Sequence, residues 1–167
     1  MGLDGNTAAE SGGDMRLVRP SEGRRAVAGG NDITFKIGPE SGAQDLSMFE
    51  SVVPPGGRVF PHVHREYEEA FYVLEGEVLF LLGENWLRGA AGTIVHIARS
   101  VTHAFHNRSE GPARLLVIHT PASAIRMIEE LAQLTPTSSV DEVAAILGRH
   151  ASAPVAGVVL PVYKPAD

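Results

Sequence analysis

The chain has 167 residues, a formal net charge of −6 and a hydrophobic fraction of 44%. A chain of this length can bury one proper core and is short for two, so we expect a single domain. The acidic balance, without any cluster of Lys or Arg, argues against a nucleic-acid or anionic-membrane surface, and the absence of cysteine excludes disulfides and thiolate chemistry. We therefore expect a cytoplasmic protein whose partner is a small-molecule substrate or another copy of the chain.

The first residues give no indication of a targeting segment. Residues 1–14 are rich in Gly and small polar residues and lack the apolar centre of a signal peptide, so we predict a mobile leader. No apolar run in the chain approaches the about 20 residues that a membrane helix needs. The sequence therefore predicts no membrane partner.

Short runs of alternating apolar character recur between turn sequences through the middle of the chain. The predicted strands are 33–37, 46–48, 59–64, 70–75, 78–82, 93–97, 102–105 and 114–119. With 18 glycines and 11 prolines in the chain, this spacing favours an all-β sandwich or barrel over long helices.

The pattern changes to a helical one after Pro121. Apolar residues recur three apart in residues 123–134. Further on, Ser139 and Glu142 form a predicted capping box, and Gly148 is the predicted stop of that second helix. We expect both helices to pack on the outside of the β barrel.

These patterns divide the chain into four segments. They are a leader at 1–14, a barrel at 15–121, a helical extension at 122–150 and an extended tail at 151–167. The tail alternates Pro with β-branched residues, so we expect it to lie along the surface or against a second subunit.

Two histidines and two adjacent carboxylates enter an apolar strand in the stretch PHVHREYEEAFYVLEG. On a strand, His62 and His64 project to the same side about 7 Å apart, so both imidazoles can converge on one ion. A bend in the polar residues that follow would return Glu69 to that face, and its neighbour Glu68 is the competing carboxylate. His103, on a later predicted strand, offers a third imidazole. Three imidazoles and one carboxylate suit a single divalent first-row metal such as Fe, Ni, Mn or Zn.

The same stretch resembles the first motif of the cupin superfamily, G-x5-H-x-H-x3-4-E-x6-G. The residues that match it are Gly56, His62, His64, Glu69 and Gly76. The second cupin motif, G-x5-P-x-G-x2-H-x3-N, is matched at Gly92, His103 and Asn107, whereas Ala98 and Ser100 replace its Pro and Gly. The resemblance covers about residues 30–120 and implies a double-stranded β-helix, or jelly-roll barrel, with a metal held by the motif histidines and Glu69. Because cupin barrels usually pair through an edge of a sheet, the resemblance also implies a homodimer.

The resemblance extends to small single-domain proteins similar to bacterial quercetin-dioxygenase-like cupins, which implies an oxygenase acting on a small aromatic or polyketide-like molecule. A non-redox alternative is a cyclase, isomerase or dehydratase that uses the metal as a Lewis acid. A second alternative is a cupin that binds a small molecule without catalysis. In the enzyme hypotheses, Glu69 or Glu68 moves the protons.

The remaining histidines and aromatic residues have less specific interpretations. The residues expected to line the substrate pocket are Phe71, Val73, His96 and Phe105. His96 is also explained as a hydrogen-bonded core histidine or one at a subunit interface. The histidines interpreted as structural are His106, His119 and His150, and the aromatic residues assigned to the core include Phe60, Tyr72 and Trp86.

Overall fold

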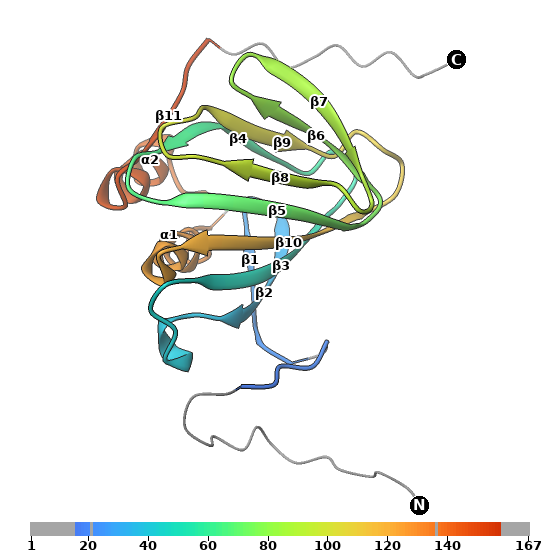
Figure 1. Cartoon of the computed structure of the whole chain (residues 1–167). Coiled ribbons are helices and arrows are strands. Elements are labelled where there is room, and N and C mark those ends of the chain that lie inside the picture. Colours follow the sequence, from blue (N-terminus) through green and yellow to red (C-terminus); the bar gives the residue numbers. More distant parts are fainter. Residues whose placement is uncertain (1–15, 21, 136, 158–167) are drawn as a thin grey trace, which may run out of the picture.

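The computed structural model describes residues 16–20, 22–135 and 137–157. The predicted leader and residues 158–167 of the predicted tail lie outside the described residues. Within the described ranges, two antiparallel sheets form the layers of a barrel, and two helices lie together at one end of it, on the left in Figure 1. The division of the chain into four segments stays a prediction.

The strands of the two sheets, as far as the chain is described, interleave along the sequence. The larger sheet has the order β1 (Arg24–Ala28), β2 (Asn31–Ile37), β3 (Ser47–Val53), β10 (Ala113–Thr120), β5 (Glu68–Glu75) and β8 (Ile94–Ile97). The smaller sheet has the order β11 (Ser152–Pro154), β4 (Arg58–His64), β9 (His103–His106), β6 (Glu77–Leu82) and β7 (Asn85–Ala90). The chain therefore crosses between the sheets at every step from β3 to β6 and again at every step from β7 to β11, which confirms the predicted all-β jelly roll.

Side chains that alternate along the strands fill the space between the sheets. The aromatic members of this core are Phe35, Phe49, Phe71, Phe80 and Phe105, each no more than 6% exposed. Burial of each contributes roughly 1.5–3 kcal/mol relative to an exposed position. The core thus provides a dry, apolar surrounding for any polar group that points inward.

Two aromatic residues assigned to the core from the sequence lie elsewhere. Phe60 is 63% exposed and Tyr72 is 39% exposed. On β5 the inward positions belong to Glu69, Phe71 and Val73, so the strand alternation turns Tyr72 to the outside.

Each predicted strand is present, and three further strands were not predicted. β1 and β7 are edge strands with mostly exposed or half-buried side chains, so their sequences show little alternation. β11 is three residues long and pairs with β4 in the register Ser152↔His64. The beginning of the predicted tail is therefore part of the smaller sheet.

The helices are α1 (Ile125–Leu131) and α2 (Val140–Arg149), and two short 3-10 turns lie at Pro39–Ser41 and Ala122–Ala124. The capping box of Ser139 and Glu142 is confirmed at the start of α2. The predicted stop at Gly148 is wrong, because the helix continues through Arg149 and the chain turns only afterwards. No helix in the described part of the chain has the length and apolar character to cross a membrane.

The two helices close one end of the barrel. Ile125 of α1 belongs to the core cluster of the barrel and is 1% exposed. A second apolar cluster joins Tyr67, Met127 of α1 and Leu147 of α2. The two helices therefore pack on the outside of the barrel at this end, as predicted, and Ile125 of α1 reaches into the barrel core.

Candidate metal centre

The four residues predicted as metal ligands meet between the two sheets. His62 and His64 come from β4, His103 from β9 and Glu69 from β5, so both sheets contribute. One ligand atom from each residue lies within 4.8 Å of the others, and all four side chains are buried. The β4–β9 register places His62 directly opposite His103.

The backbone between β4 and β5 explains why Glu69 joins the histidines. The chain bends at Arg65 and Glu66 after β4 ends at His64, and β5 begins at Glu68. The alternation of side chains restarts at that point, so Glu69 faces inward.

Hydrogen bonds at Nδ1 set the tautomers of two imidazoles. His62 Nδ1 lies 2.8 Å from the carbonyl oxygen of Phe60, and His103 Nδ1 lies 2.9 Å from that of Val101. A carbonyl oxygen only accepts, so each Nδ1 donates the hydrogen bond. In the neutral imidazole the lone pair is then on Nε2, which is the atom that faces the cluster.

His64 is fixed in the same way by a residue from β11. Its Nδ1 lies 2.8 Å from Ser152 Oγ, and the Ser152 hydroxyl donates to the carbonyl oxygen of His150 at 3.0 Å. Because the hydroxyl hydrogen is used there, Ser152 Oγ accepts the hydrogen bond from His64 Nδ1.

The proposed ligand atoms lie so close together that a cation between them would relieve the repulsion of their lone pairs. His62 Nε2 and His64 Nε2 lie 3.0 Å apart, and His103 Nε2 lies 3.0 Å from Glu69 Oε2. Lone pairs at these distances repel unless a proton or a metal ion lies between them. The donor set of three imidazole nitrogens and one carboxylate fits a divalent first-row metal.

The electrostatics keep most of these groups in the form that a metal requires. Burial, together with the neighbouring imidazoles of His103 and His64, lowers the pKa of His62 to about 3. Burial also lowers the pKa of His64. Burial opposes the charge of Glu69, but hydrogen bonds from His103, His119 and His64 outweigh it and hold its pKa well below the usual value.

His103 differs from the other two histidines of the cluster. Burial alone would lower its pKa, but the hydrogen bond and the charge of Glu69 raise it above the ordinary value. The carboxylate of Glu69 therefore favours the protonated form of His103, and a bound metal would compete with that proton for Nε2.

Sequence reasoning missed three residues that contact this cluster. Tyr67 stacks on His64 with ring centroids 4.0 Å apart, and its hydroxyl lies 3.2 Å from His64 Nε2. Ser152 supports His64, and His119 Nε2 lies 2.8 Å from Glu69 Oε1. The inward alternation of the predicted strand 114–119 could have identified His119, whereas no local pattern identifies Ser152.

The other predicted site residues lie in two places, some inside the barrel and some on its outer face. Phe71 and Phe105 follow Glu69 and His103 by two positions on the same strands, and they pack against each other with ring centroids 5.8 Å apart. Val73 is fully buried in the same core. These three residues lie inside the barrel, where a pocket beside the cluster would be apolar.

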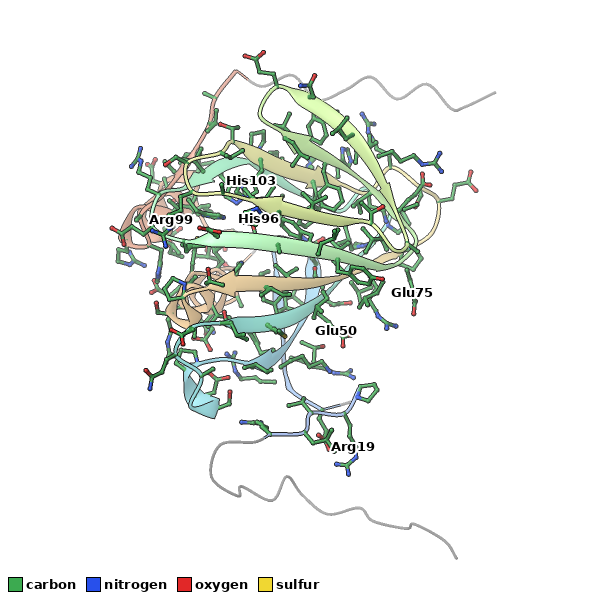
Figure 2. All side chains as sticks on the ribbon, in the orientation of Figure 1. Arg19, Glu50, Glu75, His96, Arg99 and His103 are labelled. Carbon is green, nitrogen blue, oxygen red and sulfur yellow. The ribbon has the colours of Figure 1, made fainter. Side chains whose placement is uncertain are left out.

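Glu68 and His96 are on the outer face of the larger sheet. Their side chains are 43% and 61% exposed, and Glu68 Oε2 lies 2.9 Å from His96 Nε2. Figure 2 labels His96 on β8 and His103 on β9, strands of opposite sheets. The structure does not bring this pair to the buried cluster.

A jelly-roll barrel with a buried cluster of three histidines and one glutamate defines the class of this protein. Residues 49–119 match the family described as "Cupin domain", and the barrel is a small cupin-superfamily domain.

Solved structures share this fold. The polyketide cyclase RemF from Streptomyces resistomycificus is 26% identical, with a TM-score of 0.58 over 64% of this chain and 79% of that one. A predicted oxalate decarboxylase from Thermotoga maritima is 20% identical, with a TM-score of 0.58 over 63% of this chain and 98% of that one. The second likeness supports the fold alone.

Sequence relatives cover shorter parts of the chain. An uncharacterized protein from Methanocaldococcus jannaschii is 29% identical over 75 residues, which are 45% of this chain and 60% of that protein. The HTH-type transcriptional regulator PuuR from Escherichia coli is 30% identical over 78 residues, which are 47% of this chain and 42% of the regulator. The chain thus matches less than two thirds of the length of either relative.

Proposed function

We propose that this cupin domain holds one divalent first-row metal ion and is an enzyme for non-redox conversion, such as cyclisation, of a small aromatic or polyketide-like molecule. The proposed ligands are His62, His64, Glu69 and His103. The observation that carries the metal proposal is the close approach of the donor atoms. His62 Nε2 lies 3.0 Å from His64 Nε2, His103 Nε2 lies 3.0 Å from Glu69 Oε2, and each Nδ1 is already hydrogen-bonded.

One similarity supports cyclisation, and the apolar core near the cluster supports the substrate class. The polyketide cyclase RemF is similar to this chain at 26% identity, over 64% of the chain. Phe71 and Phe105, two positions along the strands from Glu69 and His103, are apolar core residues, which suits a flat apolar ligand better than a sugar or a phosphate.

A bound metal would act as a Lewis acid that polarises a carbonyl group of the substrate. Around it, the chain supplies a dry site, because the four ligand side chains are at most 8% exposed. Burial raises the pKa of Tyr67, so its hydroxyl stays protonated and can donate a hydrogen bond to a substrate oxygen held near His64. Phe71 and Phe105 would exclude water from a substrate held beside the cluster.

The carboxylates take different parts in this proposal. Glu69 faces the cluster and keeps its charge at neutral pH, since its pKa is held well below the usual value. We therefore propose Glu69 first as a ligand and second as the group that can accept a substrate proton. Glu68 faces solvent, and a role for it in proton transfer would require a substrate on the outer face.

Metal analysis and anaerobic turnover test the proposal together. Purified protein should contain about one metal ion per chain, and metal-free protein reloaded with zinc should convert a polyketide-like test substrate under strict anaerobiosis. Dioxygen uptake with iron- or nickel-loaded protein would favour the oxygenase instead, and tight binding without turnover would favour a binding protein. Absence of stoichiometric metal from the reloaded wild type would overturn the proposal. The predicted homodimer is tested separately, by the mass of the protein in solution.

A further inference from the structure

We infer that His119 is a positioning residue of the metal centre, because it holds one oxygen of Glu69 and leaves the other oxygen to the metal. This inference rests on the proposed function for the presence of the metal. It assigns a defined role to a residue outside the four proposed ligands.

The two oxygens of Glu69 have separate partners. His119 lies directly opposite Glu69 in the β10–β5 register, and its Nε2 is 2.8 Å from Oε1. Oε2 lies 3.0 Å from His103 Nε2 and 3.6 Å from His64 Nε2. Oε1 therefore points to His119, and Oε2 points to the ligand nitrogens.

The protonation of His119 follows from its surroundings. A carboxylate only accepts, so His119 Nε2 carries the hydrogen that bonds to Oε1. Its Nδ1 is buried and has no hydrogen-bond partner among the described residues, so nothing there draws the proton away from Nε2. His119 is thus the reverse tautomer of the three cluster histidines, which makes it a donor to the carboxylate instead of a ligand.

Aromatic neighbours fix the direction of this hydrogen bond. The imidazole of His119 is fully buried, with the ring of Phe49 edge-on at 5.4 Å and the ring of Tyr67 at 5.3 Å. The ring cannot turn without displacing one of them. Glu69 is therefore presented through Oε2 alone, and a metal bound by four single donor atoms retains open positions for a substrate.

Three substitutions test this role with their effects on metal binding. His119→Phe removes the donor but keeps a ring between Phe49 and Tyr67. His119→Gln retains a donor, because its amide nitrogen reaches the place of Nε2. The control is His106→Gln, at another buried histidine three residues along β9 from His103.

Zinc affinity is measured by competition with a chelating dye, and the cobalt(II) form is examined by its visible absorption and by X-ray absorption. We expect His119→Phe to weaken zinc binding about 10- to 100-fold and to change the cobalt spectrum toward two-oxygen coordination by Glu69. His119→Gln should restore most of the affinity and the wild-type spectrum, and His106→Gln should leave both unchanged. If His119→Phe does not fold, His119→Asn replaces it, since its shorter amide cannot reach Glu69.

Nitrogen NMR of the metal-free wild type gives a readout that needs no metal. The imidazole of His119 should show a proton on Nε2, whereas that of His62 should show it on Nδ1. Wild-type affinity and spectrum in His119→Phe, no rescue by His119→Gln, or an Nδ1–H tautomer of His119 would each overturn the inference while leaving the proposed function intact. A wild type that binds no zinc would instead overturn the proposed function.

Discussion

Substitution of Glu by Gln at two neighbouring positions of β5 distinguishes the proposed metal ligand, Glu69, from its neighbour, Glu68. Glu69→Gln changes a side chain that is 7% exposed and faces three histidines, whereas Glu68→Gln changes one that is 43% exposed and pairs with His96. The two substitutions are chemically identical and differ only in the face of the strand. Glu68→Gln is therefore a matched control.

The expected loss of affinity follows from the burial. Removal of one partner from a buried charge pair costs about 3–5 kcal/mol, which is a fall in metal affinity of roughly 10²- to 10³-fold or more. An exposed pair such as Glu68–His96 contributes about 1 kcal/mol at most, and its loss should leave metal affinity almost unchanged. The new amide at position 69 can still accept from His119 and can donate to His103 Nε2. The metal-free Glu69→Gln protein should therefore be as stable as the wild type.

Thermal unfolding with and without zinc measures this difference. A metal at 100 times its Kd stabilises the wild type by about 2.7 kcal/mol, or about 5–10 °C in Tm for a chain of this size. With a Kd weakened about 100-fold, the same zinc concentration would stabilise Glu69→Gln by only about 0.4 kcal/mol. The reasoning is refuted if Glu69→Gln binds zinc within tenfold of the wild type, or if Glu68→Gln is the more damaging change.

Four further predictions follow from the site and from its connection to the helices. His62→Ala with His64→Ala should abolish bound metal while circular dichroism still shows the folded barrel; stoichiometric metal in this variant would contradict the ligand set. Ser152→Ala removes the acceptor for His64 Nδ1 and should weaken zinc binding about 10- to 100-fold, measured by dye competition. Ser139→Ala removes the cap of α2, so urea unfolding should show a loss of about 1 kcal/mol with unchanged zinc affinity; reduced affinity would contradict the separation of these roles. Metal-free protein should lose stability as the pH falls from about 6.5 toward about 3, because the folded state keeps His62 neutral, and His64 acts in the same direction, while the unfolded chain takes up the protons. The raised pKa of His103 has the opposite effect, because the stability that it contributes is lost as the pH rises through that pKa. The measurement is urea unfolding at several pH values. If the free energy of unfolding does not fall at low pH, the lowered pKa values of His62 and His64 do not dominate.

Several features of the protein were determined by local sequence alone. The alternation of side chains on strands placed His62 and His64 on one face, and the capping box placed the start of α2 at Ser139. These relations hold within a few residues of the chain, where backbone geometry leaves little choice. The sequence did not predict β1 and β7, because edge strands exposed to water do not need an alternating pattern of side chains.

The surroundings of the cluster were decided only by the tertiary structure. The register between β10 and β5 sets His119 against Glu69, which is 50 residues away in sequence, and β11 returns to β4 and brings Ser152 to His64 across 88 residues. Such registers depend on how whole strands pack around a common core, and no local periodicity encodes them. Sequence spacing could therefore nominate the donor atoms for a metal, whereas the hydrogen bonds that orient those atoms exist only once distant strands are paired.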